Sequence, residues 1–168
     1  MRPTPDRVRE TLFNWLAPHV EGASCLDLFA GTGALGLEAL SRGAKRVVFV
    51  EQEKILVHQL HRHLCLLNCQ TAVVRQQSAF QYLACTEDKF DLIFLDPPFF
   101  RGMAIPILDK ILSAGVLTEK CLVYLEVEQQ FDLTQLTSCW CPLRQQQALP
   151  PGRGHRWPGS GLPGRPGR

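Results

Sequence analysis

The sequence has no apolar run long enough to cross a membrane, and its first six residues have no apolar core like that of a signal peptide. It also has no CxxC pair and no internal repeat. The seven cysteines are odd in number and several stand inside apolar runs, which predicts reduced and mostly buried thiols. These absences predict a cytoplasmic protein with no membrane partner.

A metal site is equally poorly supported by the sequence. Cys139 and Cys141 are close together, but no second cysteine pair accompanies them, so packing is the favoured role. His58 and His61 can share one face of a helix, whereas His63 is turned well away from them. Since no acid or cysteine completes a tetrahedral set, we expect no metal ion.

The formal charge of +2 is distributed unevenly along the chain. Four of the 18 basic side chains and none of the 16 acidic ones lie in residues 150–168, so residues 1–149 carry 14 basic and 16 acidic groups. The overall charge therefore gives no support for nucleic-acid binding, which would need a local patch. Arg2, Arg7 and Arg9 form either a small phosphate-contacting cluster or an ordinary solvated helix face.

Composition divides the chain into two parts. Of the 168 residues 45% are hydrophobic, which is enough for the core of one domain. The last 19 residues include six glycines and five prolines, a composition that cannot form a packed element of a core. We therefore expect one domain in residues 1–149 and a disordered tail in residues 150–168.

Apolar segments of strand length alternate with segments of helical periodicity through most of the chain. This alternation predicts an α/β fold, with a mostly parallel sheet covered by helices on both faces. We expect Pro18 to end the first helix, and a short helix from Phe131 to Leu136. The predicted strands are 24–29, 46–51, 73–75, 90–95 and 121–127, with one more within 140–148; the predicted helices start near residues 4, 37, 53, 79 and 105.

A glycine-rich loop follows the first predicted strand. The segment 31–36 matches the pattern G-x-G-x-x-G, and Glu51 at the end of the second strand can accept hydrogen bonds from ribose hydroxyls. These features fit a dinucleotide-dependent dehydrogenase as well as a methyltransferase that uses S-adenosylmethionine. Asp27, in a D-x-F-x-G-x-G pattern with Phe29, favours the second, because it can orient the loop or meet a methionine amino group. The chain also offers no plausible hydride-acceptor constellation.

The fourth predicted strand ends in Asp96, Pro97, Pro98 and Phe99. An exocyclic amino group of a base is a poor nucleophile, because its lone pair is delocalised into the ring. Hydrogen bonds from its protons to Asp96 and to the carbonyl of Pro97 would localise that pair, and the prolines fix these acceptors in advance. Phe99 is suited to stacking on a flipped base. A carboxylate can accept from both the ring N–H and the amino group of guanine, whereas adenine has no such ring proton.

Three segments together resemble the RsmD family of bacterial methyltransferases: residues 2–16, residues 26–44 and the Asp-Pro-Pro-Phe loop at 96–99. The resemblance covers residues 2 to about 128. It implies a class I methyltransferase (Rossmann-like) fold, cytoplasmic location, S-adenosylmethionine as methyl donor, and methylation of one guanine amino group in 16S ribosomal RNA of a small-subunit assembly particle. It also implies that Gly31, Gly33, Glu51, Ser78 and Ala79 border the cofactor.

The two ends differ from the family pattern. Family members usually begin with a basic β-hairpin that helps hold RNA, and end with a strand pair that completes the sheet; here both are missing or altered, so the C-terminal strands are expected to be incomplete. We expect lower stability and weak RNA affinity as a result. We also expect a monomer. Two alternatives remain open: an adenine amino-methyltransferase acting on DNA or RNA, and a non-catalytic remnant that binds cofactor or RNA.

Overall fold

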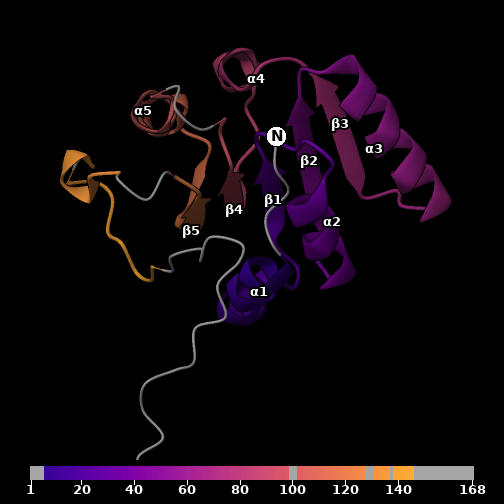
Figure 1. Cartoon of the computed structure of the whole chain (residues 1–168), viewed down its shortest axis with the longest axis horizontal. Helices are drawn as coiled ribbons and strands as arrows, with labels where there is room; N and C mark the ends of the chain where they lie inside the picture. The colour runs from indigo at the N-terminus through magenta and orange to yellow at the C-terminus, as the bar shows by residue number, and fades with distance from the viewer. Residues whose placement is uncertain (1–5, 99–101, 128–130, 137, 146–168) are drawn as a thin grey trace, which may run out of the picture.

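The protein is described by a computed structural model that covers residues 6–98, 102–127, 131–136 and 138–145. Its centre is a sheet whose five strands lie in the order β3-β2-β1-β4-β5, and every pairing between neighbours is parallel (Figure 1). This is the α/β, Rossmann-like arrangement predicted from the sequence. The strands are β1 (Ser24–Asp27), β2 (Arg46–Glu51), β3 (Ala72–Gln76), β4 (Phe90–Leu95) and β5 (Leu117–Leu125).

Helices cover both faces of the sheet. In Figure 1, α4 and α5 lie on one side of the strands, and α1 and α2 lie on the other. Each face is sealed by its own cluster of buried apolar side chains, with Phe13 and Phe49 in one and Phe90 and Ile107 in the other. The helices are α1 (Asp6–Val20), α2 (Ala34–Ser41), α3 (Lys54–Leu66), α4 (Ala79–Cys85) and α5 (Ala104–Ala114), followed by the 3-10 helix η1 (Leu133–Gln135).

The central strands are buried on both faces, which explains why they appear in the sequence as continuous apolar runs. β2 and β4 have the predicted bounds. The fifth strand begins at Leu117, four residues earlier than predicted, and it is the last strand of the sheet in the described part of the chain. All its residues are half-buried or exposed. Its first half can therefore contain polar side chains, which are those of Thr118, Glu119 and Lys120.

Three predictions about local structure are wrong. Pro18 does not end α1, which continues to Val20, because that valine is 3% exposed and anchors the last turn in the core. Residues 140–145 contain no strand, and residues 146–148 lie outside the described residues. The cysteines are free as predicted but not mostly buried: only Cys25 is buried among the seven. The short helix predicted near residues 131–136 is present as η1.

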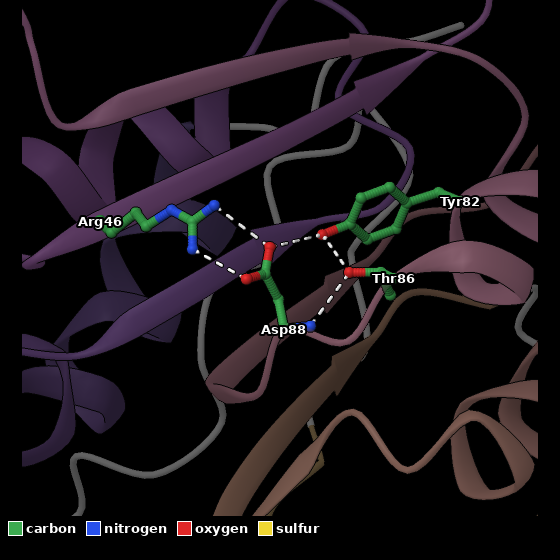
Figure 2. A network of polar contacts seen from close by, with 4 residues as sticks. All are labelled: Arg46, Tyr82, Thr86 and Asp88. Carbon is green, nitrogen blue, oxygen red and sulfur yellow. Dashed lines mark hydrogen bonds and ion pairs between the residues drawn. The ribbon is translucent and has the colours of Figure 1, made fainter.

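A polar network ties together the ends of the sheet where β2 and β4 begin (Figure 2). The Arg46 guanidinium donates two hydrogen bonds of 3.1 Å to the Asp88 carboxylate. The Tyr82 hydroxyl donates to the same carboxylate over 3.4 Å and accepts from the Thr86 hydroxyl over 3.1 Å. This network lies at the amino ends of the strands and does not involve their carboxyl ends.

In the described part of the chain, no helix combines the length and the apolar character that crossing a membrane requires.

Candidate functional site

Acidic side chains stand at the carboxyl ends of four neighbouring strands. Asp27 ends β1 and Glu51 ends β2, while Asp96 directly follows β4 and Glu126 directly follows β5. Since all pairings are parallel, these ends meet at one edge of the sheet. Ligands of open α/β sheets bind at this edge. The order along the edge is therefore Glu51, Asp27, Asp96, Glu126.

The glycine-rich loop is fixed against β2 by Glu51. Gly31 and Gly33 have φ angles of 55° and 84°, in the left-handed region that favours glycine. The Glu51 carboxylate accepts a hydrogen bond of 2.8 Å from the Gly31 N–H, and its other oxygen accepts one of 2.9 Å from the Glu53 N–H. The side chain is 6% exposed, so both bonds lie in a largely dry environment. Each carboxylate oxygen keeps a further lone pair for a ligand hydroxyl.

Asp27 holds the start of α2. Its carboxylate accepts a hydrogen bond of 3.0 Å from the Gly36 N–H. A Cβ at Gly36 would overlap the Phe49 ring, so only glycine allows this close approach of helix and sheet. Asp27 is 2% exposed, and burial raises its pKa to about 7, with further contributions from the negative charges of Asp96 and Glu51.

The end of β3 contributes the start of α4. Ser78 is the N-cap of this helix, and its hydroxyl accepts from the Gln81 N–H over 3.3 Å. The Gln81 side chain in turn accepts from the Ser78 N–H over 3.0 Å, which completes a capping box. Ala79 is 5% exposed, and Phe29 packs half-buried against the core cluster on the same face of the sheet. The predicted residues from β1, β2 and β3 thus all lie at one edge.

The Asp-Pro-Pro segment begins at the end of β4. Asp96 is half-buried, and burial raises its pKa to about 7, with a further rise from the charge of Glu126. Pro97 is buried and Pro98 is half-buried. Phe99 lies outside the described residues, so its predicted stacking role stays a prediction.

The sequence reading missed Glu126. Its N–H donates a hydrogen bond of 2.8 Å to the Leu95 carbonyl, which places it beside Asp96. The signal was present in the sequence, because an acid at the carboxyl end of a buried strand had already marked Glu51 and Asp96. The predicted fifth strand ends at residue 127, two residues beyond the observed end at Leu125, so Glu126 falls within the predicted strand and not at its end.

The charge balance at this edge fits a cationic ligand. Within the described residues, no lysine or arginine forms an ion pair with Asp27, Glu51 or Asp96. Two of these acids have raised pKa values because they are buried near other carboxylates. A bound ligand with positive charge would lower both values and relieve the repulsion. S-adenosylmethionine carries a sulfonium and an ammonium group and has ribose hydroxyls, so the residues present fit it.

The described residues contain no group of three or more histidine, cysteine or acidic side chains able to hold a metal ion.

Comparison with known proteins gives a consistent result. The family model described as conserved hypothetical protein 95 matches residues 1–149. Ribosomal RNA small subunit methyltransferase D of Escherichia coli strain K12 is 41% identical over 148 residues, covering 88% of this chain and 75% of the relative. The protein of the same name from Haemophilus influenzae is 44% identical over 133 residues, covering 77% of this chain and 69% of the relative.

Solved structures agree with this result. The structure of yhhF from Escherichia coli has a TM-score of 0.83 and 41% identity, and covers 88% of this chain and 82% of its own. That of HI0767 from Haemophilus influenzae has a TM-score of 0.70 and 43% identity, with 78% and 84% covered. Both are described as methyltransferases or methylases, so the fold is that of class I methyltransferases. This chain belongs to the family described as conserved hypothetical protein 95, the RsmD family of methyltransferases.

Proposed function

We propose that this protein transfers the methyl group of S-adenosylmethionine to the exocyclic amino group of a guanine in 16S ribosomal RNA. One observation carries the proposal most strongly: Asp96, which is suited to the acceptor base, stands on the same sheet edge as the acids suited to the cofactor. Glu51 and Asp27 lie on one side of it along the sheet edge, and Glu126 lies on the other. The names of the relatives, small subunit methyltransferase D, support small-subunit RNA as the substrate.

On the donor side, Glu51 would accept hydrogen bonds from the ribose hydroxyls, and the backbone at Gly31 and Gly33 would lie against the cofactor. Asp27 would act on the ammonium group of its methionine part through charge rather than through a close contact, since Asp27 is only 2% exposed. Phe29, Ser78 and Ala79 would border the adenosine. Bound S-adenosylmethionine supplies an electrophilic methyl group on a positively charged sulfur.

On the acceptor side, Asp96 and the Pro97 carbonyl would accept hydrogen bonds from the amino protons of the base. These bonds localise the nitrogen lone pair and aim it at the methyl group. The nitrogen–carbon bond forms as the sulfur–carbon bond breaks, and the nitrogen then loses one proton. Asp96 is placed to receive that proton, because its carboxylate already accepts a hydrogen bond from the same amino group.

We further propose that residues 1–149 form the catalytic domain, which the extent of the family match supports. We also propose that the substrate is RNA within a small-subunit assembly particle and that the protein acts as a monomer.

Labelled methyl transfer to small-subunit particles that lack the modification tests the proposal. The wild-type protein should label the RNA, and Asp96→Ala should label it at least about 100-fold more slowly, because transition-state hydrogen bonds of this kind are worth that much. Asp109→Ala is a matched control, since Asp109 is an exposed acid on α5. Labelling that is equal in all three proteins would contradict the role of Asp96, and cofactor binding without labelling would favour a non-catalytic remnant.

A further inference from the structure

A second feature of the sheet edge is a hollow beside the Asp-Pro-Pro segment. It has a volume of about 150 Å³ and is partly open. An apolar cavity of roughly 150 Å³ admits benzene, so an open hollow of this size admits the six-membered ring of a base. The apolar part of its wall comes from Pro97, Pro98, Met103, Ile105, Val127 and Phe131.

Glu126 is the acidic side chain in that wall. Leu95 and Leu125 are register partners in the parallel pair β4–β5, so Glu126 and Asp96 leave the sheet at the same level. The hydrogen bond from the Glu126 N–H to the Leu95 carbonyl fixes the backbone at this point. The Tyr124 hydroxyl donates to the Glu126 carboxylate over 3.2 Å, which limits the orientations of the side chain.

A carboxylate in the wall of a hollow can accept hydrogen bonds from polar hydrogens of a ligand that enters it. Among the four RNA bases, guanine presents two neighbouring donors on its Watson–Crick edge, the ring N1–H and one amino N–H. A carboxylate can accept from both at once. Uracil offers one ring N–H between two acceptors, while adenine and cytosine offer an acceptor next to the amino group. Of these edges, that of guanine is the complement of a single carboxylate.

We propose that Glu126 is the residue that selects guanine, by accepting hydrogen bonds from N1–H and from one amino proton of the base in this hollow. Glu126 then takes one of the two amino protons, and Asp96 and the Pro97 carbonyl share the other. The two carboxylates thus have different roles: Glu126 selects guanine, and Asp96 orients the amino nitrogen for methyl transfer. This inference rests on the proposed function, which it deepens by naming the residue that sets the choice of base.

The test changes the base at its ring N1–H and the protein at the Glu126 carboxylate. The substrates are small-subunit particles whose 16S RNA carries either guanine or 2-aminopurine at the labelled position; 2-aminopurine keeps the amino group but has an acceptor in place of N1–H. Wild-type protein should prefer guanine by about 10- to 100-fold in kcat/KM, the range for one bidentate base contact. Glu126→Gln should lower this ratio at least about tenfold, because the amide can donate to the ring nitrogen of 2-aminopurine and accept from its amino group.

Glu119→Gln is the matched control, since Glu119 is an exposed acid on β5, the strand that Glu126 follows. It should keep the wild-type ratio. Cofactor affinity and melting temperature measured on each variant distinguish a change of specificity from a loss of fold, which lowers both rates together. If Glu126→Gln does not fold, Tyr124→Phe serves instead, because it removes only the hydroxyl that orients Glu126; it should lower the ratio about two- to tenfold.

The outcomes separate the two proposals. A wild-type protein that labels guanine particles, with a ratio unchanged in Glu126→Gln or in its substitute Tyr124→Phe, would overturn the role of Glu126 and leave the proposed function intact. A wild-type protein that binds S-adenosylmethionine but labels no guanine would overturn the proposed function itself, and the inference with it. A ratio that falls in Glu126→Gln but not in Glu119→Gln supports both.

Discussion

The buried carboxyl group of Asp27 predicts that the cofactor-free protein loses stability as the pH rises. Asp27 is 2% exposed, and its pKa rises from 3.8 to about 7 mainly because it is buried. Between these two values the folded protein holds a proton that the unfolded chain has released. Stability therefore falls with increasing pH across this window and is not regained above it.

The size of the effect follows from the pKa values. At about 1.4 kcal/mol per pH unit, the rise from 3.8 to about 7 corresponds to about 4 kcal/mol in the free energy of unfolding. About 3 kcal/mol of this loss falls between pH 5 and pH 8. Asp96, whose pKa is also raised to about 7, acts in the same direction. The contribution of Asp27 is therefore obtained by comparing the free energy of unfolding of the wild type with that of a variant that lacks the Asp27 carboxylate.

Urea unfolding of the wild type and of Asp27→Asn at several values from pH 5 to pH 8 measures this difference. The asparagine carbonyl can still accept from the Gly36 N–H, but it has no charge to bury. The variant should lose less stability over this range, by up to about 3 kcal/mol. Parallel curves for the two proteins would refute the reasoning. S-adenosylmethionine should stabilise the wild type more at pH 8 than at pH 6, because its positive charge favours the ionised acid.

Three further predictions concern other parts of the fold. Gly36→Ala should lower the free energy of unfolding by about 1–3 kcal/mol in urea titrations, because the new methyl group would overlap the Phe49 ring; unchanged stability would show that the ring moves freely. Tyr82→Phe should cost about 1 kcal/mol and leave methyl transfer unchanged, since its hydroxyl serves the network at the far ends of the strands; a large loss of activity would contradict this (Figure 2). Glu51→Ala should weaken S-adenosylmethionine binding in calorimetry by at least about tenfold, because the loop at Gly31 loses its anchor; equal affinity would oppose the donor-side assignment.

The sequence predicts the central part of this fold well, for a physical reason. A parallel strand that is covered on both faces has to be apolar at nearly every position, so the sequence predicts both ends of β2 and of β4 correctly. The glycine-rich loop can also be recognised in the sequence, because positive φ angles at Gly31 and Gly33 restrict the choice of residue. The strand ends, and hence most of the candidate site, follow from these elements.

The failures lie where burial depends on distant parts of the chain. β5 is half-buried, so its first half is polar and lacks the apolar pattern of a strand, and the predicted bounds differ from the observed ones. Cys65 and Cys85 sit within apolar stretches but on exposed faces of α3 and α4, which only the packing of the helices decides. Pro18 shows the same effect, since the burial of Val20 outweighs the local preference of proline to end a helix.

The identity of the methylated nucleoside tests the central claim most directly. Small-subunit particles that lack the modification would be incubated with this protein and S-adenosylmethionine, and the RNA digested to nucleosides for mass spectrometry. The account predicts a single new product, guanosine methylated on its exocyclic amino group, formed by the wild type and Asp109→Ala but not by Asp96→Ala. Methylated adenosine, or an equal yield of methylated guanosine from Asp96→Ala, would contradict it.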